Sequence, residues 1–192
     1  MGDPEEKEKG APQEGRPTQP FWREKTILLV FLTILVSDQV TKVMVVKSFE
    51  RPDDPNERVK VVNGFFDLVY RTNTGAAFSM FKDSNKALAG ISIIALGALI
   101  WFRRHFDNGT RRAKIALGLL MGGILGNVID RLAYGWVVDF ARIYIDRQTG
   151  RPLEWPAFNI ADSAICVGVG LLFIIAWSEQ KKSESEEETG EN

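Results

Sequence analysis

Two aspartates stand at the edges of long apolar segments, where charge is unusual. Asp139 follows one apolar run in the sequence GWVVDF, and Asp162 lies near the start of the next run in FNIAD. If both runs cross a membrane as neighbours, the two carboxyl groups meet at one membrane face. Two adjacent carboxylates cannot both ionise, so one keeps a proton while the other stays charged. Such a pair can activate water with one group and protonate a peptide group with the other, which makes Asp139 and Asp162 candidate catalytic residues of a hydrolase.

A further pair of charges lies inside the first apolar run. Asp38 and Lys42 have i, i+4 spacing, so on a helix they share one face and can neutralise each other. Charge is costly within a membrane, and two interpretations stay open: an ion pair that fixes helix packing, or support for a site at the same depth. A nucleophilic pair of Ser37 and Lys42 is disfavoured, because a helix sets these two side chains roughly 140° apart.

Polar residues also follow two other segments. Asn73 precedes a run of small residues that includes Gly75, and lack of side-chain bulk lets a peptide backbone approach closely, although a tight turn explains the same pattern. Asn127, Asp130 and Arg131 follow a glycine-rich apolar run. We expect Asp130 and Arg131 to form a local charge pair or to anchor the helix end, with a lipid phosphate or carbonyl as the alternative partner of Arg131.

The start of the last apolar run has a second explanation. Trp155 and Pro156 form a start signal for a helix, and Asn159 and Asp162 have the spacing of an N-cap with an acidic third residue. An acidic residue in this position stabilises a helix by itself. A purely structural role for Asp162 is therefore the alternative to catalysis.

The elements that must position these residues can be read from the apolar pattern. We predict transmembrane helices over about 26–46, 87–102, 114–132 and 159–177, and three of these four apolar runs are longer and less charged than a soluble core helix needs. Val59–Val62 and Phe65–Tyr70 flank Asn63-Gly64, which predicts a hairpin with a type I′ turn. Residues 136–140 are expected to be a short extended or re-entrant piece. The fold class is an all-α membrane protein with four transmembrane helices and a small extramembrane β-hairpin or sheet on the outer side.

Composition excludes several classes of function. The 192 residues carry 24 basic and 25 acidic side chains, a net charge of −1, so we expect no nucleic-acid partner. One cysteine, Cys166, and one histidine, His105, argue against a zinc site, and we expect neither a metal nor a cofactor. Cys166 is interpreted as a small residue that faces helices or lipid.

Charge outside the apolar runs predicts the orientation. The tails 1–25 and 178–192 are rich in charged residues and are expected to be disordered, which leaves 26–177 as the membrane domain. Five basic residues crowd the 103–114 connection, and the positive-inside rule places that connection and both tails in the cytoplasm. The hairpin and the two aspartates then lie at the outer face.

These residues alone leave two functions open. An acid pair at a membrane face suits an aspartyl hydrolase, but it also suits a proton or cation transporter. A non-catalytic assembly protein is a third, weaker hypothesis.

Four blocks of sequence carry a resemblance to a known family. They are Ser37-Asp38-Gln-Val-Thr-Lys42, Asn73-Thr-Gly-Ala-Ala-Phe78, Gly126-Asn127-Val-Ile-Asp130-Arg131 through Val138-Asp139-Phe140, and Phe158-Asn159-Ile-Ala-Asp162. In these blocks and their order the chain resembles the bacterial lipoprotein signal peptidases, also called signal peptidase II. The blocks span residues 37–163, whereas the tails and the segment 47–58 match no motif.

The resemblance implies an aspartic endopeptidase of the bacterial inner membrane. It would remove the signal peptide of a diacylglyceryl-modified prolipoprotein by cutting before the lipid-bearing cysteine. Asp139 and Asp162 would be catalytic, and the residues that shape the site or contact substrate would be Asp38, Lys42, Asn73, Gly75, Asn127, Asp130, Arg131 and Asn159. The partners would be the prolipoprotein and membrane lipid, and we expect a monomer.

Overall fold

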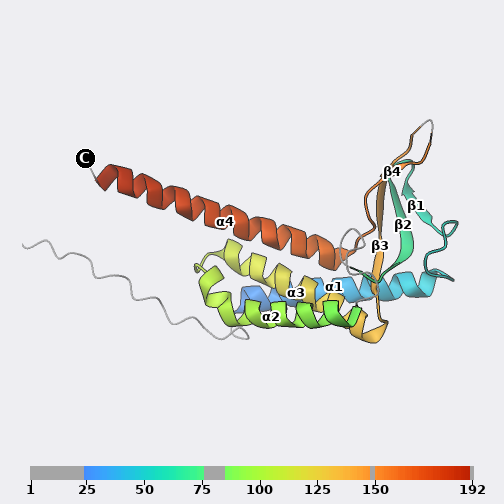
Figure 1. The fold of residues 1–192 in the computed structure, drawn as a ribbon, viewed down its shortest axis with the longest axis horizontal. Helices are drawn as coiled ribbons and strands as arrows, with labels where there is room; N and C mark the ends of the chain where they lie inside the picture. The colour runs from blue at the N-terminus through green and yellow to red at the C-terminus, as the bar shows by residue number, and fades with distance from the viewer. Residues whose placement is uncertain (1–23, 76–84, 148–149, 191–192) are drawn as a thin grey trace, which may run out of the picture.

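The computed structural model describes residues 24–75, 85–147 and 150–190. In this part of the chain the elements are α1 (Lys25–Ser48), β1 (Val59–Val62), β2 (Phe66–Asn73), α2 (Asn85–Phe106), α3 (Arg111–Ala133), β3 (Val137–Ile145), β4 (Leu153–Glu154) and α4 (Ile160–Gly190). The predicted disorder of residues 1–23 lies outside the described residues. Figure 1 shows the helices along one direction and the sheet standing across them at one end.

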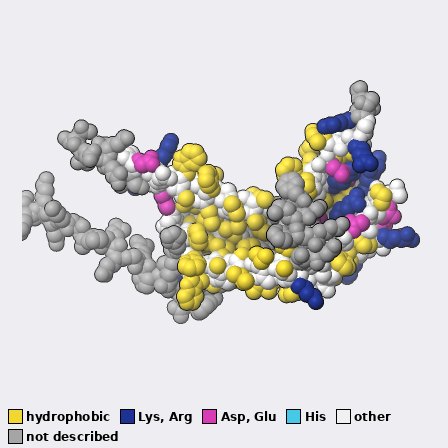
Figure 2. Space-filling model, in the orientation of Figure 1, with side chains coloured by type: hydrophobic (Ala, Val, Ile, Leu, Met, Phe, Trp, Pro, Cys, Tyr) yellow, Lys and Arg dark blue, Asp and Glu magenta, His cyan; other side chains and the backbone are white. Residues whose placement is uncertain are grey.

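Each of the four helices contains a stretch that is long and apolar enough to cross a membrane. Among the described residues these stretches are Lys25–Ser48, Asn85–Arg103, Arg111–Ala133 and Ile160–Lys182, which confirms the predicted spans. Apolar side chains cover the helical body in Figure 2, whereas charged side chains gather over the sheet and toward the far end of α4. The charge distribution therefore matches a membrane-embedded bundle with an extramembrane sheet.

The third helix, α3, forms the centre of the bundle and contacts α1, α2 and α4. Its glycines make this close packing possible. A Cβ atom on Gly122 would lie 2.9 Å from the Phe31 carbonyl of α1, and one on Gly123 would lie 2.5 Å from the Ala161 carbonyl of α4. Close backbone approach of this kind drives helix association where lipid is as apolar as the side chains.

The extramembrane part is larger than the predicted hairpin. Among the described residues it is an antiparallel sheet in the order β1-β2-β3-β4. Residues 137–145, only part of which we predict as extended, form the inner strand β3 and pair with β2 through Arg71↔Asp139 and Asn73↔Val137. This pairing carries Asp139 to the end of β2, where Asn73 lies.

The hairpin turn differs from the type I′ prediction. Gly64 has a φ of 76°, but Asp53 is the only non-glycine residue in the described chain with a positive φ, so Asn63 lacks the positive value that type I′ requires. Phe65 N–H donates to the Val62 carbonyl at 3.1 Å, and the pattern is that of a type II turn. The turn also contacts β3, because Tyr144 N–H donates to the Phe65 carbonyl at 2.9 Å.

The last helix continues beyond the predicted end at residue 177. It runs to Gly190, through most of the segment predicted to be disordered. Glu, Gln and Lys are good helix formers, and Gln180 Nε2 donates to Glu184 Oε1 at 3.0 Å along one helix face. A high charge content was therefore a poor indicator of disorder here.

Candidate active site

Asp139 lies at the point where β3 meets the end of β2. Its side chain is 3% exposed. Asn73 Nδ2 donates to Asp139 Oδ2 at 3.0 Å, and Asn159 Nδ2 donates to Asp139 Oδ1 at 2.8 Å. Both carboxyl oxygens are therefore held by amides that come from different elements.

Asp162 is fixed by a capping box at the start of α4. Asp162 N–H donates to Asn159 Oδ1 at 2.8 Å, and Asn159 N–H donates back to Asp162 Oδ2 at 3.2 Å. The predicted capping role is thus confirmed. Its other oxygen, Oδ1, accepts from Asn127 Nδ2 at 2.8 Å. Asp162 therefore caps α4 and also belongs to the site.

The two aspartates share one amide neighbour and one pocket. Asn159 contacts both carboxyl groups, and both aspartates line a pocket of about 910 Å³ that runs between the sheet and α4. Burial and the nearby Asp162 carboxylate raise the pKa of Asp139 to about 7, against the opposing hydrogen bond from Asn73. The raised pKa lets Asp139 keep a proton at a pH at which an ordinary carboxyl group has lost it, which suits acid–base hydrolysis.

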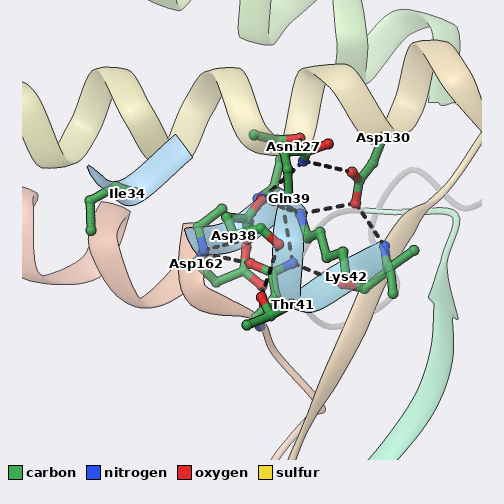
Figure 3. A network of polar contacts seen from close by, with 12 residues as sticks. Ile34, Asp38, Gln39, Thr41, Lys42, Asn127, Asp130 and Asp162 are labelled. Carbon is green, nitrogen blue, oxygen red and sulfur yellow. Dashed lines mark hydrogen bonds and ion pairs between the residues drawn. The ribbon is translucent and has the colours of Figure 1, made fainter. Parts of the chain in front are cut away.

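Behind the pocket lies a buried charge network between α1 and α3 (Figure 3). Lys42 Nζ lies 2.8 Å from Asp38 Oδ2 and 2.9 Å from Asp130 Oδ2, and it donates to Asn127 Oδ1 at 3.0 Å. The predicted pair of Asp38 and Lys42 is confirmed. The network reaches the aspartate pair, because the same Asn127 donates to Asp162.

The network also fixes two backbone segments of the site. Asp38 Oδ1 accepts from Ala161 N–H at 2.9 Å at the start of α4, and Asp130 Oδ2 accepts from Val138 N–H at 3.0 Å beside Asp139. Lys42, Asp38 and Asp130 are at most 2% exposed. Direct substrate contact, which the resemblance implies for some of these residues, does not match this burial.

The expected local pair of Asp130 and Arg131 does not form. Asp130 instead pairs with Lys42. Arg131 NH2 donates to the Gly75 carbonyl at 3.3 Å and NH1 to the Asn127 carbonyl at 3.4 Å. The reason is helical geometry, because consecutive residues point in different directions.

The sequence comparison decides the family. The family model described as "Signal peptidase (SPase) II" matches residues 30–178, which include all ten predicted site residues. The chain belongs to the signal peptidase II family.

Individual members of the signal peptidase II family match most of the chain. The lipoprotein signal peptidase of Syntrophotalea carbinolica is 39% identical over 79% of this chain and 91% of its own length. The one of Geobacter sulfurreducens is 39% identical over 80% of this chain and 92% of its own length. A solved structure titled "Bacterial membrane enzyme structure by the in meso method at 1.9 A resolution" is 31% identical, with a TM-score of 0.65 over 79% of this chain and 92% of that one.

One polar residue of this signal peptidase II site escaped the sequence analysis. Gln39 Nε2 lies 3.2 Å from Asp38 Oδ2, 3.1 Å from Asp130 Oδ1 and 3.2 Å from the Gly126 carbonyl. It holds the two carboxylates on either side of Lys42. Two features of the sequence could have indicated Gln39. It is an amide in an apolar run, and its i, i+3 spacing to Lys42 places both side chains on one helix face.

Ser37 and Cys166 lie near the site but outside its network of carboxylates and amides. Ser37 Oγ donates to the Thr33 carbonyl at 2.7 Å, and Lys42 is engaged by carboxylates, so the pair of Ser37 and Lys42 is absent, as expected. Cys166 is exposed and lines the pocket beyond Asp162. This exposed position on α4 fits the interpretation that Cys166 is a small residue facing lipid.

Proposed function

We propose that Asp139 and Asp162 are the catalytic pair with which this signal peptidase II family member removes signal peptides from prolipoproteins. The observation that carries the proposal is the joint placement of two carboxyl groups in one pocket, tied through Asn159. Asp139 comes from the extramembrane sheet and Asp162 from a membrane helix. The scissile bond of a membrane-anchored precursor lies at the same boundary.

The geometry supports a direct attack by water. The ionised carboxyl group takes a proton from water as the water oxygen attacks the peptide carbonyl carbon, and the protonated partner donates its proton to the carbonyl oxygen. Collapse of the tetrahedral intermediate breaks the C–N bond, and a proton passes to the leaving nitrogen. The amides of Asn73, Asn127 and Asn159 hold the carboxyl oxygens in place during these transfers.

The remaining predicted residues support this pair in our proposal. Asn73 and Gly75 line the pocket, where the lack of a side chain at Gly75 lets the substrate backbone approach closely. Arg131 holds the Gly75 carbonyl and so positions that wall. Asp38, Lys42 and Asp130 act through Asn127 and the backbone rather than by contact with the substrate.

The membrane setting supports the finer identity of the substrate. We propose a diacylglyceryl-modified precursor, because the pocket is open along the α4 residues Ile165 and Cys166, where a lipid-bearing chain can enter from the side. Residues 103–114 lie at the end of the bundle opposite the sheet (Figure 1), and their basic charge supports a cytoplasmic position for that end and both tails. The catalytic pair then faces the outside of the bacterial inner membrane, within a monomeric unit of residues 26–177.

The lipid part of the proposal is tested by two matched precursors. Purified protein in lipid nanodiscs receives the same prolipoprotein with and without the diacylglyceryl group. We expect cleavage before the cysteine of the modified form and at least about tenfold slower cleavage of the unmodified form, measured by mass spectrometry. Equal rates contradict the proposed lipid recognition, and proton flux in proteoliposomes without cleavage would favour the transport alternative.

The pH dependence follows from the raised pKa of Asp139. Below about pH 7 this carboxyl group keeps its proton, and above that value it loses it. Because the mechanism needs one proton on the pair, we expect kcat/KM to fall with rising pH above about 7, approaching about tenfold per unit. The test is a cleavage profile from about pH 6 to 9 in one detergent. A constant kcat/KM across this range contradicts the assignment of the shared proton.

A further inference from the structure

One face of α4 packs against the rest of the bundle. Ala161 and Ala164 are buried on it, and a Cβ atom on Gly168 would lie 2.8 Å from Leu120 of α3. Cys166 lies two residues from both Ala164 and Gly168, which places it on the opposite side of the helix. It is exposed there and lines the pocket. The side of α4 that turns away from the bundle therefore begins at the pocket.

This exposed side of α4 continues from the pocket toward the other end of the bundle. Gly170, Phe173 and Trp177 return to within roughly 40° of Cys166 on the helix, and all three are exposed. The rings of Phe173 and Trp177 meet edge to face, with centroids 5.6 Å apart. We call the row of Cys166, Gly170, Phe173 and Trp177 the outer face of α4. It offers a membrane-spanning peptide an apolar surface that leads away from the catalytic pair.

The outer face continues beyond the membrane, because the helix extends past the end of its apolar span. Glu184 follows Trp177 by about two helical turns and so lies on the same side. It is exposed and accepts from the neutral amide of Gln180 at 3.0 Å, a contact that leaves its charge in place. Glu179 lies on the opposite side, where Asn108 of the α2–α3 connection donates to its Oε1. The base of this extension is thus tied to the bundle while its outer face stays exposed.

The extension lies beyond the signal peptidase II match, which ends at residue 178, and it is strongly acidic. Residues 184–192 contain five glutamates and no basic residue. The carboxyl end of a helix also carries a partial negative charge, and the last turn of α4 has no basic residue to offset it. Lys181 and Lys182 lie at the membrane boundary, a common position for cations. Beyond them, α4 suits a cationic partner.

A signal peptide has the length and the charge to follow this face. Signal peptides of about 15–30 residues begin with a positively charged segment, which an apolar segment and the cleavage site follow. As a helix, about 20 residues span about 30 Å. The catalytic pair lies at the sheet end of α4 and the extension at the other end (Figure 1), and Glu184 is about 33 Å along the helix from Asp162 at about 1.5 Å per residue. With the scissile bond beside Asp162, the positively charged segment therefore lies level with the extension.

We propose that the acidic extension of α4 binds the positively charged N-terminal segment of the signal peptide, with the apolar part of that peptide along the outer face. The substrate is then held on both sides of the membrane, by the catalytic pair at one and by the extension at the other. Glu184 is a specificity-determining residue, because it favours a basic segment over a neutral one. This inference rests on the proposed function, since only a signal peptide that is cleaved at Asp139 and Asp162 has its first residues at this end.

The test uses two precursors that differ only in charge at the N-terminus. Both carry the same apolar segment and diacylglyceryl cysteine, but one has lysines and the other glutamines at the same N-terminal positions. In nanodiscs of zwitterionic lipid at low salt, the lysine precursor should have a KM lower by about fivefold, with the same kcat, because the charges lie far from the catalytic pair. High salt should bring the two KM values together, because it screens exposed charges.

Charge reversal in the extension locates the effect. Glu184→Lys combined with Glu188→Lys should raise the KM of the lysine precursor and leave that of the glutamine precursor unchanged, which also shows that the variant folds. Glu179→Gln, on the opposite side of α4, is the control and should keep the parent's preference. The inference is overturned by equal KM values in the parent, the result expected if lipid alone covers the outer face, or by an equal change for both precursors in the double variant. If the parent cleaves neither precursor, the proposed function fails, and this inference fails with it.

Discussion

Replacing Asp139 or Asp162 by Asn is expected to lower kcat by about 10²- to 10⁴-fold, because either change removes one of two groups that must exchange protons in the same step. The two aspartates act as a unit. The double variant should therefore be about as slow as the slower single variant, rather than slower by the product of both effects. The measurement is single-turnover cleavage of the diacylglyceryl-modified precursor in nanodiscs.

The matched control lies next to the same strand. Asp146 is an exposed carboxylate just past the end of β3, away from the pocket residues, so Asp146→Asn should leave the rate unchanged. Thermal unfolding of all variants in one detergent shows that the protein still folds. Rates within a few-fold of the parent for either Asp139→Asn or Asp162→Asn would refute the catalytic assignment.

The largest effect on stability is expected from Lys42→Met. This change leaves the buried carboxylates of Asp38 and Asp130 without their cation, although Gln39 still donates to both. Loss of one partner from a buried ionic cluster costs about 3–5 kcal/mol. We expect a marked fall in the thermal unfolding midpoint, together with a lower cleavage rate, since Asn127 and the start of α4 lose their support.

An exposed lysine on the same helix provides the control. Lys47→Met removes the same charge from α1 at an exposed position and should change stability by less than about 0.5 kcal/mol. Equal unfolding midpoints for the two variants would mean that the network contributes no net stability. The charge network would then contribute only to the geometry of the site.

Local features of the site were predictable from sequence, because they depend on short-range rules. Apolar runs define the spans, and the spacing of Asn159 and Asp162 predicts the capping box that the structure contains. The pair of Asp38 and Lys42 follows in the same way from helix periodicity. Each of these arguments needs only a few consecutive turns of chain.

The contacts that complete the site were not predictable in this way. Asn73 and Asp139 are 66 residues apart and meet only because β2 and β3 pair in one register. The choice of Lys42 over the adjacent Arg131 as the partner of Asp130 depends on how α1 and α3 pack. The bond from Thr72 N–H to Asp53 Oδ1 spans 19 residues, and neither periodicity nor a motif in the connection of Asp53 predicts it.

The charge network between α1 and α3 has a consequence for how the protein reaches its membrane. α1 leaves the ribosome with Asp38 and Lys42 already able to pair within one helix. Asp130 arrives later on α3, and among the described residues its ion pair is with Lys42 of α1. A charged residue at the centre of a lone inserting helix costs about 2.5–3.5 kcal/mol, and a charge near the helix end, where Asp130 lies, costs less. Docking of α3 on α1 therefore offsets the cost of inserting Asp130, and it also places Asn127 beside Lys42. The helix contact that lowers the cost of insertion is thus also the contact on which Asp162 of α4 is later positioned.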